Sequence, residues 1–163
     1  MSHLPVLRLA PVKENRNNCP FLTGDHCAIH DAEPRVCALY PLAQEISRKG
    51  QVSYFLQPTG CGGQVIEARV EDYLARYDVP AREQTDVRWA QTCMTLEDTV
   101  EQLGAQLSPV LVRRMQDKLW QALYFGYDYA APFLPQLEKN LHWLDVEFAK
   151  LTEYQQKRNN ASK

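Results

Sequence analysis

Four cysteine thiols near the start of the chain are the side chains best suited to chemistry. They are Cys19, Cys27, Cys37 and Cys61, separated by seven, nine and twenty-three residues. Thiolates are soft ligands that select zinc, copper(I) or iron–sulfur clusters over magnesium or calcium. Where no secretion signal is evident, clustered thiols are more often metal ligands or redox groups than a disulfide framework. We therefore predict that these four side chains converge on one metal centre.

The spacing of the cysteines bears on which metal they bind. Structural zinc sites commonly use two cysteines separated by two to four residues, and this sequence contains no such pair. Iron–sulfur clusters also accept ligands from widely spaced loops, so we expect a four-iron cluster, with zinc as the alternative. His26 and His30 lie close to Cys27 and are substitute imidazole ligands. The competing interpretation is that the four cysteines are buried small hydrophobic side chains.

Short motifs surround these cysteines and form a recognisable unit. In chain order they are Cys19-Pro20-Phe21-Leu22, Cys27-Ala28-Ile29-His30, Pro34-Arg35-Val36-Cys37 and Tyr40-Pro41-Leu42. Together they resemble the YkgJ-type cysteine-cluster family, whose members are described as zinc- or iron-chelating proteins. Cys61-Gly62-Gly63 stands where that family has its last C-x-G element. The resemblance covers about Leu7 to Tyr77, and it implies a cysteine-bound zinc or iron centre.

The chain departs from the family pattern in its ligand region. Typical members begin with a further C-x-x-C group and adjacent cysteines, which would lie upstream of Leu4. Either the four cysteines here form a reduced site, or this start truncates a longer protein. His30 replaces the usual tyrosine, and Pro34-Arg35 reverses the usual order of arginine and proline. The flagellin lysine methylases contain a related cysteine domain, so the resemblance also implies an accessory protein or enzyme of protein modification.

The segment that carries the cysteines is predicted to consist of loops and short strands. Residues 1–66 contain four of the five cysteines and five of the seven glycines of the chain, and glycine disfavours long helices. Within the segment, Ala43–Ser47 and Gln51–Gln57 flank Arg48-Lys49-Gly50, a pattern typical of a β-hairpin. Because an isolated hairpin is marginally stable in water, it must lean on the helices or on a bound metal.

Residues 67–163 are predicted to be helical, because apolar side chains recur there every three or four residues. The pattern predicts four helices: Ala68–Tyr77, ended by Val79-Pro80; about Glu83–Leu107; one capped by Ser108-Pro109 and stopped by Gly126; and a last one carrying Leu134–Leu151. We expect the last two helices to pair antiparallel. The tail Gln155–Lys163 is predicted to be disordered.

The same periodicity predicts which side chains are buried. In the long helix they are Trp89, Cys93, Leu96, Val100, Leu103 and Leu107, so Cys93 is assigned to the core and not to the metal. In the next helix they are Val112, Met115, Leu119 and Leu123. Aromatic residues gather around the last turn, namely Tyr124, Phe125, Tyr127, Tyr129, Phe133 and Trp143. We expect core contacts for them, with a groove for a partner or ligand as the alternative.

The composition excludes several classes of protein. Its 163 residues include 18 Lys and Arg and 20 Asp and Glu, a net charge of −2 that argues against nonspecific nucleic-acid binding. Hydrophobic residues form 45% and charged residues 23%, the balance of a globular protein. No apolar stretch approaches the roughly 20 residues that a membrane span requires, and Met1–Val12 lacks a signal-peptide core. We therefore expect a cytoplasmic protein.

These patterns predict an α+β protein that is mainly α. A loop-rich, metal-bound segment (1–66) with a small β-hairpin packs on a C-terminal helical bundle (67–163) in one globular unit. The first functional hypothesis is an iron–sulfur protein with a structural, redox or sensing role. The alternative is a zinc-stabilised module whose helical half binds a protein partner or a second copy. Four thiolates leave no open position on the metal, which favours a non-catalytic role while leaving enzymatic activity open.

Overall fold

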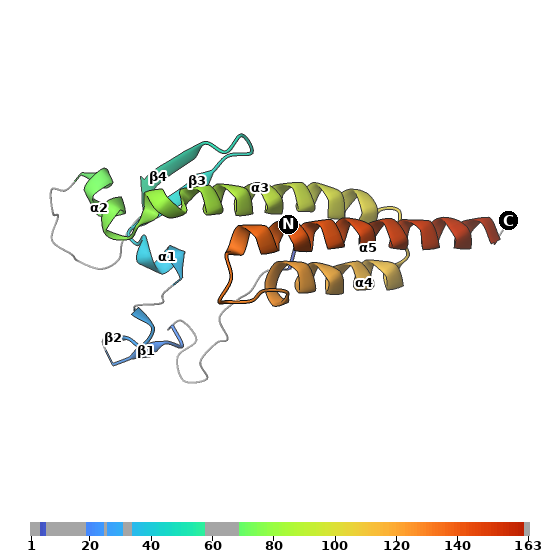
Figure 1. Cartoon of the computed structure of the whole chain (residues 1–163), viewed down its shortest axis with the longest axis horizontal. Coiled ribbons are helices and arrows are strands. Elements are labelled where there is room, and N and C mark those ends of the chain that lie inside the picture. Colours follow the sequence, from blue (N-terminus) through green and yellow to red (C-terminus); the bar gives the residue numbers. More distant parts are fainter. Residues whose placement is uncertain (1–3, 6–18, 25, 31–33, 58–68, 162–163) are drawn as a thin grey trace. The chain divides into compact units, whose positions relative to one another are not determined.

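The computed structural model describes residues 4–5, 19–24, 26–30, 34–57 and 69–161 (Figure 1). These residues form two compact units. The cysteine unit comprises the described residues from Cys19 to Gln91, and the helical unit comprises Thr92–Ala161 with Leu4 and Pro5. The predicted fold class, α+β and mainly α, is confirmed. The predicted boundary at residues 66 and 67 lies outside the described residues.

Short strands and helices build the cysteine unit. In chain order they are β1 (Leu22–Thr23), β2 (His26–Cys27), α1 (Arg35–Ala38), β3 (Leu42–Ile46), β4 (Val52–Leu56), α2 (Val70–Arg76) and the first part of α3 (Val79–Gly104). Strands β3 and β4 pair antiparallel, with Leu42 opposite Leu56 and Ile46 opposite Val52. Gly50, at φ +78°, turns the chain between them. The hairpin predicted from the sequence is confirmed.

The β3–β4 hairpin packs against α3. A two-stranded sheet alone is only marginally stable in water, so it needs such a contact. A Cβ atom added to Gly50 would lie 3.2 Å from both Val87 and Gln91, so the turn packs directly against the helix. The Tyr54 hydroxyl donates to the Glu83 carboxylate at 3.3 Å. A small apolar cluster lies beneath, formed by buried Leu39, Leu74 and Val79 with partly buried Leu42, Tyr54 and Tyr77.

The junction between α2 and α3 differs from the prediction. The long helix starts at Val79, not near Glu83, and Val79-Pro80 begins it instead of ending the preceding helix. Proline is well suited to a first turn, where its missing N–H has no partner to lose and its φ already fits a helix. Helix α2 ends at Arg76, and Asp78, at φ +53°, reverses the chain.

The helical unit consists of the rest of α3, α4 (Pro109–Trp120), the π-helical turn η2 (Gln121–Phe125) and α5 (Phe133–Ala161). Helices α4 and α5 run antiparallel and pack on each other (Figure 1), which confirms that prediction. Gly126 ends η2, and the Asn140 amide closes the turn by donating to the Gly126 carbonyl at 3.1 Å. None of the described helices combines the length and the apolar character needed to cross a membrane.

Leucines dominate the core of the helical unit. Leu119, Leu137 and Leu144 are each 0% exposed. On α4 the buried line is Leu111, Met115 and Leu119, and the predicted Val112 is only half-buried. Residues four apart lie on the same face of a helix, so Met115 and Leu119 share their buried face with Leu111 and not with Val112. Cys93, which was predicted to be buried, is half-buried, and Thr92 beside it is the buried residue, at 3% exposed.

The end of the chain also differs from the prediction. Helix α5 continues to Ala161, although the tail from Gln155 is predicted to be disordered. Gln155 accepts a hydrogen bond from the Ser108 backbone N–H at 3.0 Å, next to the start of α4. Lys157 and Glu153, four residues apart, form an ion pair at 2.6 Å. These polar contacts, which an apolar pattern does not reveal, support the last turns.

Candidate metal centre

The first two cysteines lie on one short hairpin. Strands β1 and β2 pair antiparallel, with Leu22 opposite Cys27 and Thr23 opposite His26, and Gly24, at φ +61°, lies in the turn. The chain also folds back before β1, because the Leu22 N–H donates to the Cys19 carbonyl at 3.1 Å. Cys19 and Cys27 are therefore both at the end of the hairpin that lies away from its turn.

These thiols are accessible in the described structure. Cys19 and Cys37 are exposed and Cys27 is half-buried. The described residues from 19 to 38 include no buried side chain, and the first one along this segment is Leu39, which is 2% exposed. The three described thiols of the predicted site therefore do not pack as buried hydrophobic side chains.

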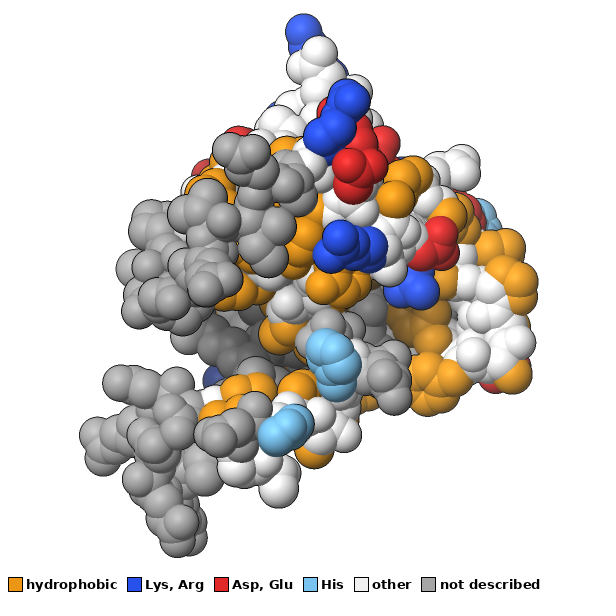
Figure 2. Space-filling view, turned by 90° about the vertical axis from the view of Figure 1, so that its left-hand side faces the viewer, with side chains coloured by type: hydrophobic (Ala, Val, Ile, Leu, Met, Phe, Trp, Pro, Cys, Tyr) orange, Lys and Arg blue, Asp and Glu red, His pale blue; other side chains and the backbone are white. Residues whose placement is uncertain are grey.

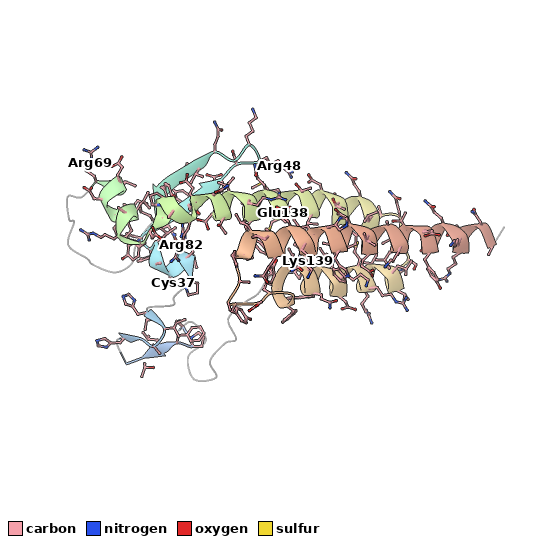
Figure 3. The ribbon with its side chains drawn as sticks, viewed as in Figure 1. Cys37, Arg48, Arg69, Arg82, Glu138 and Lys139 are labelled. Carbon is pink, nitrogen blue, oxygen red and sulfur yellow. The ribbon has the colours of Figure 1, made fainter. Side chains whose placement is uncertain are left out.

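Cys37 belongs to the four-residue helix α1 (Figure 3). Its N–H donates to the Pro34 carbonyl at 2.8 Å, and its carbonyl accepts from the Tyr40 N–H at 3.2 Å. The helix is anchored by Arg35, whose Nη2 lies 2.6 Å from the Asp86 carboxylate and donates to the Val79 carbonyl at 3.3 Å. Arg35 therefore positions the backbone around Cys37 by holding α1 against α3.

The structure brings together part of the predicted ligand set. Cys19 and Cys27 share a hairpin, while Cys37 lies on a separate helix. Among the described residues, no three His, Cys, Asp or Glu side chains meet as a metal-binding group. Cys61 lies outside the described residues. The donor chemistry of the described thiols fits a soft metal, and a centre that uses all four stays a prediction.

A basic pocket beside α1 is a feature that the sequence patterns did not reveal. It has a volume of about 300 Å³, and its polar lining is His30, Arg35, Arg76, Asp78 and Arg82. Its arginines come from α1, the last residue of α2 and the first turn of α3. Arg76 and Arg82 are six residues apart, but Arg35 is 41 residues before Arg76 and only the fold brings it to them, so no local motif could have predicted the pocket. His30, a substitute metal ligand in the prediction, is part of its wall.

A charged groove of about 500 Å³ lies between α4 and α5 in the helical unit. Lys118 and Lys150 both pair with Glu147, and the Lys118 ammonium lies 5.3 Å from the centre of the Trp143 ring. Hydrogen bonds from Lys118 and then Lys150 hold the pKa of the Glu147 carboxyl below its usual value. These contacts join the two helices across their polar edge.

The fifth cysteine lies apart from the predicted site, in the helical unit. Burial, and next the nearby Glu97 carboxylate, raise the pKa of the Cys93 thiol to about 11. Such a thiol stays protonated at neutral pH, whereas metal ligands and nucleophiles are thiolates. This agrees with its assignment to the core.

Comparisons with models of protein families, with curated proteins and with solved structures found no match for this chain. The relation to the YkgJ-type family therefore remains a resemblance carried by the motifs around Cys19, Cys27 and Cys37.

Proposed function

We propose that the protein is a metal-binding protein in which Cys19, Cys27, Cys37 and Cys61 hold a four-iron iron–sulfur cluster. One observation carries the proposal: the described residues from 19 to 38 form two strands and a helix without a single buried side chain. Fixing the backbone costs about 1–2 kcal/mol per residue, and the apolar side chains here, of which Phe21 and Ile29 are only partly buried, offset little of that cost. Metal binding by thiolates can supply folding free energy to such a segment.

The accessibility of the thiols supports the same proposal. A metal must reach its ligands, and Cys19 and Cys37 are exposed. Cys19, Cys27 and Cys37 are not joined in disulfides, and thiols persist in that form in a reducing compartment, so we place this function in the cytoplasm. In a four-iron cluster each iron binds one thiolate, and bridging sulfides fill its other positions, so the role we propose is structural, redox or sensing and not hydrolytic.

A second candidate is a zinc-stabilised module that binds a protein partner through its helical unit. The observation that favours it is the exposure of aromatic side chains around the turn before α5. Phe125 is 71% exposed and Tyr129 is 99% exposed. Aromatic residues are enriched in the buried parts of protein interfaces, so this turn is the surface that such a partner would contact.

Elemental analysis of protein purified without oxygen tests both candidates. The cluster predicts about four iron and four sulfide per chain and broad visible absorption, whereas the module predicts about one zinc per chain and no colour. The variant Cys27→Ser should lose the metal, while Cys93→Ser, which removes a thiol of the helical core, should retain it. Equal metal content in wild-type protein and in Cys27→Ser would rule out the four-thiolate centre.

A further inference from the structure

The basic pocket beside α1 is the strongest unexplained feature of the cysteine unit. Three arginines from three elements line it: Arg35 on α1, Arg76 at the end of α2 and Arg82 in the first turn of α3. Figure 2 views the molecule from the side of α2, where basic side chains (blue) reach the surface above His side chains (pale blue). We propose that this pocket binds the phosphate group of a small molecule.

The charge balance of the pocket favours an anion. Its lining carries three guanidinium groups and one carboxylate, that of Asp78. A second carboxylate, that of Asp86, pairs with Arg35 from outside the lining, so the guanidinium groups outnumber the carboxylates that face them by three to two. Asp78 lies 3.9 Å from the Arg82 guanidinium, and the two side chains are 68% and 66% exposed. An exposed pair at that separation contributes little free energy. A phosphate can therefore replace Asp78 as the partner of Arg82 at small cost.

The Arg35 guanidinium is held in place before any ligand arrives. Asp86 and the Val79 carbonyl bind its Nη2. Its Nε is a buried donor that meets no acceptor among the described residues. A guanidinium offers five N–H donors, and the contacts with Asp86 and the Val79 carbonyl engage Nη2. A preorganised donor loses less entropy on binding than a mobile one.

The arrangement of the donors favours phosphate over carboxylate. A carboxylate is planar and is satisfied by one guanidinium fork, whereas a phosphate presents several oxygens in different directions. Guanidinium groups arriving from three separate elements match the second geometry. The 26-residue helix α3 also begins at the pocket, and the positive end of a helix favours an anion there.

The size of the pocket limits the ligand. At about 300 Å³ it lies at the lower end of the range for small-molecule sites. It can hold a phosphate with a small organic group attached. None of the three arginines is a predicted metal ligand, although His30, a substitute ligand in the prediction, is part of the same wall.

Calorimetric titration of the full-length protein with inorganic phosphate, at an ionic strength fixed with sodium chloride, tests the proposal. We expect saturable binding with a Kd below about 10 mM. The double variant Arg76→Gln/Arg82→Gln should weaken it by at least about tenfold, because it removes two charge-assisted contacts. Its matched control is Arg48→Gln/Arg69→Gln, which removes the same charge from exposed positions outside the pocket (Figure 3).

Several outcomes would overturn the proposal. These are a lack of saturation by wild-type protein, equal affinities of the two double variants, or acetate binding as tightly as phosphate. Circular dichroism checks that the variants are folded. Amide chemical shifts of wild-type protein provide a readout that needs no variant: phosphate should move the signals of Asp78 and Arg82. Unchanged signals at both positions would also refute the site.

Discussion

The helical unit and the first part of the cysteine unit solve the problem of stability in opposite ways. Three leucines of α4 and α5 are completely buried, whereas the described residues from 19 to 38 bury no side chain. Hydrophobic burial is the dominant favourable contribution to folding. Apolar packing therefore stabilises the helical unit, whereas the cysteine segment needs another source of free energy.

The comparison teaches where a ligand matters in this chain. A ligand that binds only the folded state stabilises it by mass action, and the largest gain falls where apolar packing contributes least. Cys19, Cys27 and Cys37 lie in the segment from 19 to 38, where apolar packing is weakest. The arginines of the basic pocket lie in this segment or next to it in the fold. The helical unit, in contrast, should respond to changes in its core and not to the removal of metal.

The largest expected effect in the helical unit comes from opening its core. Leu144→Ala should lower the free energy of unfolding by about 2–5 kcal/mol, because it removes a fully buried side chain and leaves a cavity. Urea unfolding followed by circular dichroism measures the change. Val146→Ala on the same helix, where the side chain is 42% exposed, is the control and should change little.

Measuring the metal content of Leu144→Ala tests whether the helical unit and the cysteine segment are stabilised by separate means. Leu144→Ala should retain the metal of the wild-type protein at temperatures where it remains folded. If the core substitution releases metal, or if it costs less than about 1 kcal/mol, the two regions are not stabilised by separate means.

The thiols of the cysteine segment and the thiol of the helical unit are expected to differ in reactivity. In metal-free protein at pH 8, iodoacetamide should modify exposed Cys19 faster than Cys93, because only the thiolate reacts and burial keeps the Cys93 thiol protonated. The pKa of Cys93 rises from 9.0 to about 11 through burial and the nearby Glu97. Mass spectrometry of timed samples measures both rates. In denaturing urea the two rates should converge, and similar rates in folded protein would contradict the burial of Cys93.

The elements predicted from the sequence follow from local patterns. The Gly-containing turn between alternating strands predicted β3 and β4 within a residue of their ends. The apolar repeat predicted α4 and α5 and their antiparallel pairing. Both signals are read within one element, where the periodicity of side chains dictates which face is buried. That is why the helical unit could be predicted in most of its detail.

The errors arose where contacts distant in sequence decide the outcome. The extension of α5 past Gln155 rests partly on a hydrogen bond to Ser108, 47 residues away. The start of α3 at Val79 depends on Asp78, whose left-handed backbone no pattern marks. The phosphate pocket needs Arg35 to be brought to Arg76 and Arg82 by the fold. For the metal centre, residue types and motifs predicted the ligands, but spacing alone does not establish their geometry.

The smallest expected effect is electrostatic and concerns Glu147, between α4 and α5. Lys118 and Lys150 hold its pKa below the ordinary value of 4.5, so the folded state favours the ionised carboxylate. This contribution to stability is complete above the unfolded-state pKa and is lost as the pH falls through the lower folded-state pKa. Thermal unfolding of wild-type protein and of Glu147→Gln should therefore differ at neutral pH and converge in acid, once the pH falls below the folded-state pKa of Glu147.

Asp145→Asn, on the same helix, is the matched control for this titration, because no ion pair of Asp145 is seen within the described part of the chain. Its difference from wild-type protein should vary little with pH. If Glu147→Gln proved as damaging as Leu144→Ala, the ion pairs and not the leucines would hold α4 against α5. Lys150 is 64% exposed although Glu147 is only 14% exposed, so water screens part of this interaction. We therefore expect the order of effects in the helical unit to follow burial, which is the property that the cysteine segment lacks.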